Sequence, residues 1–257
     1  MPDAIFADPR LARIYDAFDG PRVDLDLYLG IASEVGATSV LDIGCGTGSL
    51  AVRLASTGRS VVGVDPALAS LEIARAKDSR VTWIHGDAAS LPPLSVDLAT
   101  MTGNVAQVFL GDDWEAALRG VHGALRNGGH FVFETRRPER RAWEDWARAK
   151  PRVLVGVREQ LELLDVSLPF VSLRHIYSFP DGSAIASDST LRFRSRAEIE
   201  QTLVRSGFKV VDVRDAPDRP GREYVFVAQK GVAQKGVVQQ GVVQKGMTQK
   251  GVPQRGQ

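Results

Sequence analysis

A glycine-rich loop at positions 44–48 is the feature that most restricts how this chain can fold. The stretch 39–50 reads S-V-L-D-I-G-C-G-T-G-S-L, in which a short aliphatic run leads into three glycines that alternate with Cys45 and Thr47. Three glycines in five residues allow the backbone to turn sharply and to approach a ligand closely. The segment 49–56 then has helical spacing, and the N-terminus of a helix favours polar or anionic ligand groups. The stretch therefore predicts a strand, a ligand-binding loop and a helix.

Acidic residues stand where a nucleoside site would need them. Asp42 lies inside the first apolar run, Asp65 ends the second run, and Asp87 closely follows a third run at 81–85. In open α/β sheets, an acidic residue at the end of the second strand holds ribose hydroxyls. The loop departs from the G-x-G-x-x-G spacing of dinucleotide sites, because position 49 is Ser. On these residues alone, a nicotinamide-binding domain and a non-catalytic domain of the same fold stay open.

The loop D-x-G-x-G-x-G, followed by V-D-P and G-D-A, resembles the class I S-adenosylmethionine-dependent methyltransferases. The specific motifs lie between residues 39 and 134, and the similarity is to the small-molecule type, of the kind of methyltransferase domains 25 and 11. The resemblance implies S-adenosyl-L-methionine as cofactor, S-adenosyl-L-homocysteine as product, and in-line methyl transfer to a small-molecule acceptor. It implies cofactor contacts from Tyr15, Asp42, Gly44, Gly46, Asp65, Pro66, Asp87, Ala88 and Gly103.

The resemblance also implies what the central residues of this set do. Gly44 and Gly46 let the backbone pass under the methionine and ribose parts of the cofactor. Asp42 orients the loop and the cofactor ammonium, and Asp65 accepts hydrogen bonds from both ribose hydroxyls. We expect Asp65 to be the most sensitive of these residues, because it ends its strand opposite the loop.

Other members of the set have ordinary alternatives. Tyr15 precedes Asp16 in a segment that covers the cofactor in similar proteins, and core packing would explain it equally well. Asp87 would accept from the adenine amine while the Ala88 amide donates to a ring nitrogen, but an Asp after Gly86 also fits a simple turn.

Strands alternate with helices along most of the chain, which predicts a parallel α/β sheet with right-handed crossovers. We expect seven strands at 39–43, 60–65, 81–85, 97–101, 130–134, 209–213 and 223–227. The resemblance implies a Rossmann-like, doubly wound seven-stranded sheet of order 3-2-1-4-5-7-6 with strand 7 antiparallel. The long gap before residue 209 predicts a small inserted antiparallel β-sheet with strands at 153–164, 170–179 and 184–193, after a helix at 138–149.

The chain divides into three expected regions. Residues 1–37 form an N-terminal helical cover, with helices at 9–18 and 23–35. Residues 38–228 form the S-adenosylmethionine-binding methyltransferase domain, with the inserted sheet at about 152–193. Residues 229–257 repeat a five-residue unit that begins as QKGVA, which is too short a period to bury a core. We expect this segment to be a disordered, low-complexity tail.

The charge balance restricts the kind of substrate, and the cysteine content indicates the redox compartment. The chain has 32 basic and 31 acidic side chains, but five of the basic ones lie in 229–257 with no acidic residue. Residues 1–228 therefore carry 27 basic and 31 acidic side chains, which argues against a nucleic-acid substrate. Cys45 is the only cysteine, so the chain has no internal disulfide framework and fits a reducing compartment. We interpret Cys45 as a small residue against the ligand rather than as a nucleophile.

No long apolar run or signal-peptide pattern is evident, so we expect a cytoplasmic protein with no membrane partner. We expect no metal site, and the oligomeric state stays open.

The sequence is less specific about the residues that bind the methyl acceptor. The stretch 101–109 reads M-T-G-N-V-A-Q-V-F and lacks the [D/N]-P-P-[Y/F] motif of enzymes that methylate DNA bases and protein glutamines. Gly103-Asn104 is similar to the same place in small-molecule N-methyltransferases of the glycine type. The catalytic residue is unknown, and the candidates for holding the acceptor are Asn104, Gln107, His175 and Tyr177.

Other polar residues near this edge have two interpretations. Arg136 and Arg137 follow the fifth strand, where an arginine could clamp an acceptor carboxylate or simply lie in solvent. Trp143 and Trp146 have helical spacing and are expected to pack in the interior, as is His85 around the cofactor. A methyltransferase acting on RNA or protein, and a non-catalytic cofactor-binding module, are the alternatives to a small-molecule methyltransferase.

Overall fold

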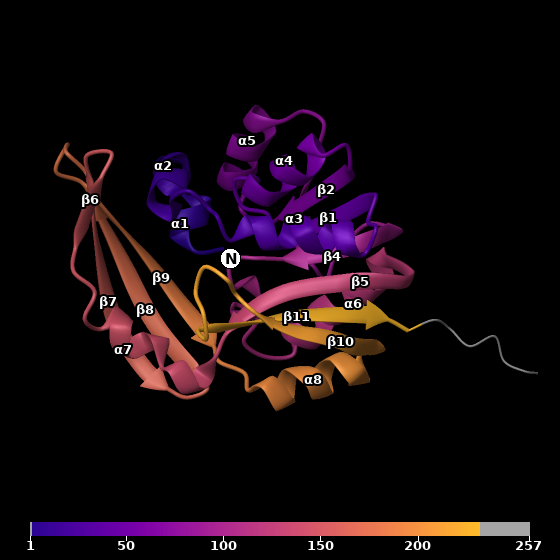
Figure 1. The fold of residues 1–257 in the computed structure, drawn as a ribbon. Coiled ribbons are helices and arrows are strands. Elements are labelled where there is room, and N and C mark those ends of the chain that lie inside the picture. Colours follow the sequence, from indigo (N-terminus) through magenta and orange to yellow (C-terminus); the bar gives the residue numbers. More distant parts are fainter. Residues whose placement is uncertain (1, 232–257) are drawn as a thin grey trace, which may run out of the picture.

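The computed structural model describes residues 2–231 and contains a seven-stranded and a four-stranded sheet (Figure 1). The larger sheet has the order β10-β11-β5-β4-β1-β2-β3, and β11 runs antiparallel to both of its neighbours. The other pairs are parallel. This confirms the expected α/β class and the 3-2-1-4-5-7-6 order. The strands are β1 Ser39–Ile43, β2 Ser60–Asp65, β3 Thr82–His85, β4 Val96–Met101, β5 Leu125–Arg136, β10 Phe208–Asp215 and β11 Glu223–Lys230.

Helices cover both faces of this sheet because the central strands carry apolar side chains on both sides. In β1, Val40 packs toward one face and Leu41 and Ile43 toward the other, as the two-residue period of a strand requires. The first face is covered by α3 (Leu25–Glu34) and α4 (Ser49–Ser56), and the second by α6 (Asp113–Ala124) and α8 (Arg196–Arg205). A fifth helix, α5 (Leu68–Lys77), follows β2 and precedes β3.

The inserted sheet is antiparallel, with the order β6-β7-β8-β9, and lies to one side of the main sheet (Figure 1). Its strands are β6 Arg152–Leu154, β7 Val157–Ser167, β8 Phe170–Ser178 and β9 Ala184–Arg192. The expected single strand over 153–164 is wrong, because a two-residue turn at Val155 and Gly156 divides it. Both turn residues have positive φ (46° and 79°), and the sequence hides the turn because a β-branched residue seldom adopts that conformation.

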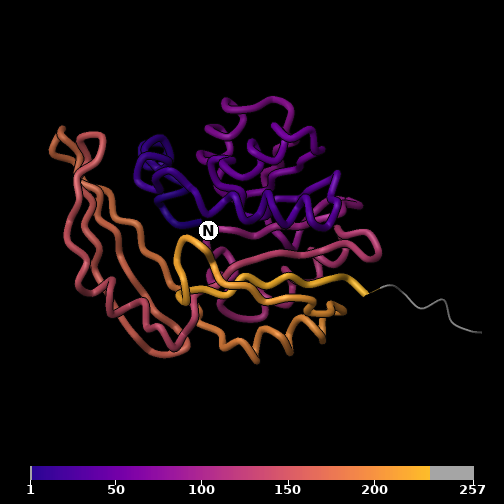
Figure 2. Tube along the Cα trace, in the orientation of Figure 1, coloured from indigo at the N-terminus to yellow at the C-terminus, as the bar shows by residue number. Residues whose placement is uncertain are grey.

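The N-terminal segment forms two helices, α1 (Ala4–Ala7) and α2 (Pro9–Asp19), between the inserted sheet and the main sheet (Figure 2). The helix α1 was not expected from the sequence. It is attached to the inserted sheet by a hydrogen bond of 2.9 Å from the Ile5 amide to the Ser187 hydroxyl of β9. On its other side, the Ser70 hydroxyl of α5 donates to the Phe6 carbonyl at 2.9 Å. This segment therefore bridges the two sheets.

Three other boundaries differ from expectation. The sequence predicts a helix from about Pro66 to Lys77 with Pro66 in its first turn, but α5 begins at Leu68, so Pro66 precedes it. The expected helix over 138–149 is a 3₁₀ turn, Pro138–Arg140, and a short helix α7, Ala142–Trp146, separated by Arg141 with φ of 48°. The strand β5 starts at Leu125, five residues early, and its pairing with β4 shifts register around Gly128.

The last strand, β11, continues past the expected end at 227 to Lys230. The Lys230 ammonium donates to the carbonyls of His122 and Leu125, at 2.6 and 2.7 Å, where α6 ends. The Gln229 side chain donates to the Gly128 carbonyl at 3.1 Å. Positions 229 and 230 therefore belong to the folded part, whereas 232–257, which we expect to form a tail, lie outside the described residues.

This boundary gives a prediction for two truncations. Ending the chain after Gly231 should leave the melting temperature unchanged, because the repeat cannot bury a core. Ending it after Ala228 should lower the melting temperature by about 5 °C or more, because two residues of strand pairing and the Lys230 contacts to α6 are lost. Differential scanning calorimetry of both truncated proteins and the full chain measures this, and equal melting temperatures for the two truncations would contradict it.

Candidate functional site

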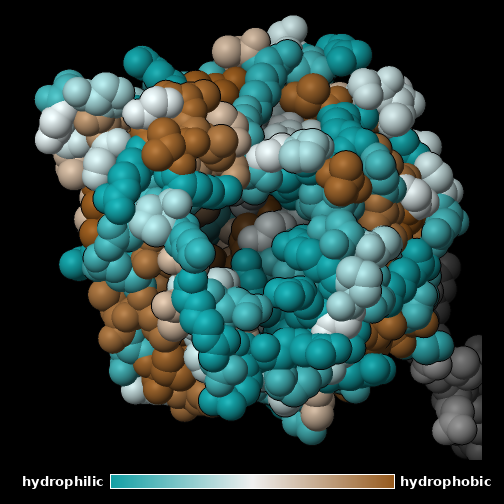
Figure 3. Space-filling model, turned by 60° about the vertical axis from the view of Figure 1, so that its left-hand side comes forward, coloured by the Kyte–Doolittle hydropathy of each residue, from teal (hydrophilic) through white to brown (hydrophobic). Residues whose placement is uncertain are grey.

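A cavity of about 610 Å³ lies at the carboxyl edge of the large sheet. The loop after β1, the ends of β2 and β4, the N-terminal helices and β9 all contribute to its wall. The molecule is visibly hollowed on the side that carries the inserted sheet and the N-terminal helices (Figure 3). The volume is within the range of cavities that hold a cofactor or a small ligand.

The glycine loop is fixed by its neighbours. The amides of Gly44 and Cys45 both donate to the Val64 carbonyl, at 2.9 and 3.1 Å. One Asp65 oxygen accepts from the Gly46 amide at 2.8 Å, and the other accepts from the Ala67 amide at 2.7 Å. Gly44, Gly46 and Gly48 have φ of 66°, 53° and 85°, so the loop requires glycine at these positions.

Space as well as conformation restricts position 44. A Cβ atom there would lie 2.8 Å from Cγ2 of Val105, in the 3₁₀ turn Val105–Gln107 that follows β4. The loop therefore packs directly against this turn, and only glycine at position 44 leaves room for Val105.

Asp42 and Asp65 have unusual protonation behaviour for carboxyl groups. Asp42 is buried and its Oδ1 accepts from the Thr100 hydroxyl at 2.9 Å. Burial raises the pKa of Asp42 to about 7, although the Thr100 hydrogen bond acts in the opposite direction. Burial also raises the pKa of Asp65, against the two amides that it accepts from. A positively charged ligand group beside them would favour the ionised carboxylates.

The wall of the cavity is strongly acidic. Among the described residues that line it, one carries a positive charge, Arg22, and this guanidinium is already paired with Asp19 at 2.7 Å and Asp24 at 2.8 Å. Six carboxylates line the same cavity, namely Asp3, Asp42, Asp65, Asp87, Asp113 and Asp188. Such a lining attracts cationic groups and disfavours ligands that carry several negative charges.

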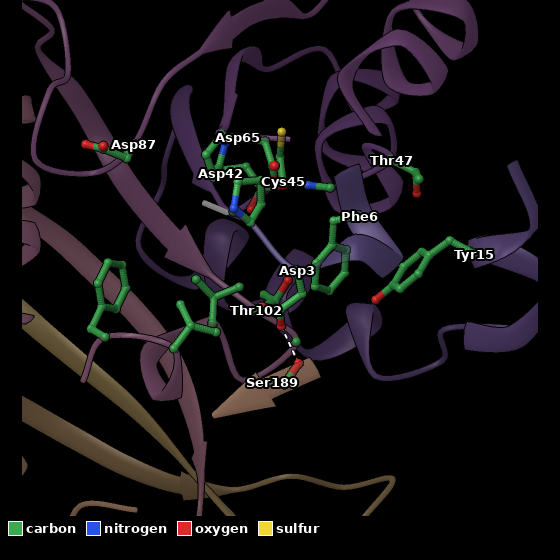
Figure 4. A pocket seen from close by; sticks show the side chains of 18 of the residues that line it. Asp3, Phe6, Tyr15, Asp42, Cys45, Thr47, Asp65, Asp87, Thr102 and Ser189 are labelled. Atoms are coloured by element: carbon green, nitrogen blue, oxygen red, sulfur yellow. Dashed lines mark hydrogen bonds between the residues drawn. The ribbon is translucent and has the colours of Figure 1, made fainter. Parts of the chain in front are cut away.

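The N-terminal helices and the inserted sheet meet over the cavity. Phe6 and Tyr15 lie together on one side of it, with ring centroids 5.3 Å apart (Figure 4). The Ser189 hydroxyl of β9 donates to Asp3, and both residues line the cavity. Sequence reasoning missed Asp3, Phe6 and Ser189, because α1 was not predicted and nothing in the alternation of β9 shows which face meets the cavity.

The structure brings together eight of the nine residues that the sequence assigns to the cofactor. The cavity is lined by Tyr15, Asp42, Gly44, Gly46, Asp65, Pro66, Asp87 and Gly103. Ala88 is buried behind the wall, and Asp87 accepts from the amides of Ala89 and Ser90, both at 2.9 Å, as a turn residue does. Cys45 also lines the cavity, and burial raises the pKa of its thiol, which stays protonated.

The four acceptor candidates lie outside the lining of this cavity. His175 Nδ1 is 2.8 Å from Oε1 of Glu159, and the Tyr177 hydroxyl donates to the same oxygen at 3.1 Å. Tyr177 also packs edge-to-face on Phe18, so this group joins the inserted sheet to α2. Their part in the reaction stays a prediction.

The other two candidates hold neighbouring side chains. The Asn104 amide donates to Glu223 at 2.9 Å, and Oε1 of Gln107 accepts from Arg136 at 2.9 Å. Both side chains are buried. Asn104 directly precedes the 3₁₀ turn that follows β4, and Gln107 is the last residue of that turn.

Residues 2–231 contain neither a membrane-spanning helix nor a cluster of metal ligands. None of the helices in this range is long and apolar enough to cross a bilayer. Within the same range, no three His, Cys, Asp or Glu side chains are grouped as metal ligands would be.

Comparison with known proteins gives a consistent result. Residues 40–129 match the family described as "Methyltransferase domain". An uncharacterized methyltransferase from Anoxybacillus flavithermus is 31% identical over 150 residues, which cover 57% of this chain and 69% of the relative. In two other curated relatives the match spans only about half of their own length, 52% and 50%.

Solved structures share the fold. An S-adenosylmethionine-dependent methyltransferase from Clostridium acetobutylicum superimposes with a TM-score of 0.73 at 19% identity, covering 86% of this chain and 98% of the other. The S-adenosylmethionine-bound CalS10, an amino pentose methyltransferase from Micromonospora echinaspora, gives a TM-score of 0.62 at 19% identity, covering 82% and 93%. With the glycine loop, the acidic strand ends and the sheet order in place, the chain belongs to the class I S-adenosylmethionine-dependent methyltransferases.

Proposed function

We propose that this protein methylates a small-molecule acceptor inside the acidic cavity. The observation that carries the proposal is the closure of that cavity by α1, α2 and β9, joined through Ile5 and Ser187 and through Asp3 and Ser189. An acceptor has to enter a space of about 610 Å³ shared with the cofactor, which favours a small molecule over a folded protein or a duplex. CalS10, by its description, acts on an amino pentose, which is an acceptor of this size class.

The residues of the cavity fit the cofactor by charge. S-adenosylmethionine supplies a methyl group on a cationic sulfonium, and it also carries an ammonium and a carboxylate. The six aspartates suit the two cationic groups, and Arg22 suits the carboxylate. A nicotinamide dinucleotide would bring a pyrophosphate into the same acidic lining. The lining therefore favours the sulfonium cofactor over the nicotinamide one.

We assign the cofactor contacts from the hydrogen bonds that remain available. Asp65 uses each oxygen once, for the amides of Gly46 and Ala67, and each oxygen keeps a lone pair for a ribose hydroxyl. Asp42 would orient the ammonium, and Asp87 would accept from the adenine amine with its other oxygen, Oδ2. The protein then holds donor and acceptor in line, and such positioning alone contributes about 7–11 kcal/mol to methyl transfer.

A screen for methyl transfer tests the acceptor class. The protein is incubated with labelled S-adenosylmethionine and with pools of metabolites, total RNA or unfolded protein, and label transfer is followed by mass spectrometry. We expect labelled product from a metabolite pool. Transfer to RNA or protein alone would contradict the small-molecule assignment, and transfer to none would favour a non-catalytic cofactor-binding module.

Asp65→Ala should weaken S-adenosylhomocysteine binding by about two powers of ten or more, because it removes both hydroxyl acceptors. Hydrogen bonds to a charged group contribute about 1.5–3 kcal/mol each, and about 1.4 kcal/mol corresponds to tenfold in affinity. Isothermal titration calorimetry measures this, with NAD as the ligand that should not bind. Asp65→Asn is a matched variant that keeps the side-chain volume. Glu72→Ala is the control, because Glu72 is an exposed carboxylate on α5. Unchanged affinity in Asp65→Ala would refute the assignment.

The raised pKa of Asp42 predicts how cofactor affinity changes with pH. Binding of a cationic ligand requires the ionised carboxylate, so affinity should fall by up to about tenfold per unit as pH decreases below the pKa of about 7. Between about pH 5.5 and 7 the ligand ammonium itself stays protonated. Titrations of S-adenosylhomocysteine in this range should therefore show proton release, and Asp42→Asn should remove both the release and the pH dependence.

Asp42 also makes the stability of the ligand-free protein depend on pH, but in the opposite direction to the cofactor affinity. Its folded-state pKa of about 7 exceeds the ordinary value near 3.9, so the folded state binds more protons between these values. Stability therefore falls as pH rises from about 4 to 7, and Asp42→Asn should raise the ligand-free melting temperature at pH 8. If Asp42→Asn melted lower at pH 8 and bound normally at pH 6, Asp42 would be structural only.

A further inference from the structure

A second cavity, of about 520 Å³, lies where β5 ends and the loop between β10 and β11 passes the short helix α7. Four arginines line it, Arg136, Arg140, Arg219 and Arg222, together with Trp146 and the carboxyl groups of Asp145 and Glu223. Its lining is therefore net positive, whereas the lining of the cofactor cavity is net negative. Nothing in the cofactor assignment uses these residues.

Arg136 is the most informative of the four arginines. Its Nη1 donates to Oε1 of Gln107 at 2.9 Å, and its guanidinium carbon lies 5.2 Å from the ring centre of Trp146. Among residues 2–231, no carboxylate oxygen lies within 4.0 Å of its guanidinium nitrogens, so Arg136 forms no ion pair there. Burial lowers the pKa of Arg136, opposed by the more distant carboxylate of Glu223. A largely buried cation without a counter-ion is unfavourable, and a bound anion would offset this.

Arg140, which lines the same cavity, adds a second guanidinium. Its Nε donates to the Gly221 carbonyl at 2.6 Å, and in the described part of the chain it too has no carboxylate partner. The remaining two arginines differ, because Arg219 pairs with Glu223 at 3.0 Å and Arg222 pairs with Asp145 at 3.1 Å. Two of the four arginines are therefore available for an outside anion.

Glu223 is a buried carboxyl group that lines the same cavity. Its side chain is 2% exposed, and Oε1 accepts from Asn104 at 2.9 Å, but Oε2 is buried without a hydrogen-bond partner in residues 2–231. A carboxylate oxygen only accepts hydrogen bonds, so this atom needs a donor, whereas an anion in the cavity would contact the arginines. Asn104 directly follows Gly103, which lines the cofactor cavity, so the two cavities adjoin at these residues.

We propose that the second cavity holds an anionic group of the methyl acceptor, a phosphate or a carboxylate, with Arg136 and Arg140 as its direct ligands. This inference rests on the proposed function for the identity of the bound molecule, but not for the anion site itself. Planar guanidinium groups bind phosphate and carboxylate oxygens in pairs, and Trp146 offers a ring face to an adjacent flat part of the molecule. The acceptor then carries its nucleophile toward the acidic cavity and its negative charge away from it.

Direct titration tests the anion site without any methyl transfer. Inorganic pyrophosphate and succinate, as the phosphate and carboxylate probes, are titrated into wild type, Arg136→Gln and Arg140→Gln at fixed ionic strength. The control is Arg141→Gln, which removes a neighbouring exposed arginine that pairs with Glu144 at 2.7 Å and does not line the cavity.

We expect at least one probe to bind wild type, and each cavity variant to weaken that probe by about tenfold or more. The control should bind like wild type, and S-adenosylhomocysteine affinity should be equal in all four proteins. No binding of either probe, or the same loss in Arg141→Gln, would overturn the proposal. Should Arg136→Gln fail to fold, the exposed Arg140→Gln still decides the outcome.

The metabolite screen then identifies the bound molecule. Pools of phosphate esters, carboxylates and uncharged metabolites are tested separately, and we expect product from one of the anionic pools. The acceptor KM should rise by about tenfold or more in Arg140→Gln, with the KM for S-adenosylmethionine unchanged. Product from the uncharged pool alone would overturn the acceptor assignment. Absence of product from every pool would count against the proposed function, while the probe titrations would still decide the anion site.

Discussion

The hydrogen bonds of one carboxylate, Asp65, determine the shape of the cofactor site. Its two oxygens hold the Gly46 amide and the Ala67 amide, so one side chain connects the glycine loop after β1 to the start of α5 after β2. The Val64 carbonyl holds the same loop through the Gly44 and Cys45 amides. The loop is therefore built on the end of β2, and its geometry depends on the parallel pairing of β1 with β2. Burial of Asp65 makes this arrangement unfavourable for the charge until a ligand donor is present.

The sequence predicted many of the residues that line this cavity, because they lie at or next to strand ends. The glycines, Asp42, Asp65 and Asp87 all stand where a strand of strong β pattern stops, and the carboxyl ends of parallel strands meet at one edge. The parallel α/β class was likewise predictable from alternating strands and helices, whereas the order 3-2-1-4-5-7-6 came from the resemblance to the methyltransferases. The physical signal for the strands, the loop and the acidic residues lies within a few residues of the feature that it predicts.

The parts that the sequence did not predict depend on contacts between distant segments. Asp3 and Ser189 meet over the cavity although 186 positions separate them. His175 and Tyr177 do share a face of β8, as alternate residues must, but Glu159 of β7 engages both, and no local pattern shows that pairing. The extension of β11 to Lys230 was hidden because the repeat QKGVA already begins inside the strand, and pairing with β5 and β10 overrides its composition.

Two buried carboxyl groups lie near the place where the two cavities adjoin, and they differ in the hydrogen-bond partners that the fold supplies. Glu134 accepts from the Tyr28 hydroxyl at 2.5 Å and from the amides of Gly103 and Asn104 at 2.8 and 3.2 Å, so the fold itself supplies its partners. Glu223 has partners for one oxygen only, and burial together with the Glu134 charge raises its pKa. Glu134 therefore has partners for both oxygens without a ligand. Within residues 2–231, Oε2 of Glu223 has none, and Arg136, which lines the same cavity as Glu223, bonds to Gln107 but to no carboxylate. A molecule that offers an anion to Arg136 and a hydrogen-bond donor to Glu223 would satisfy both groups at once, which is a stricter chemical requirement than either group sets alone.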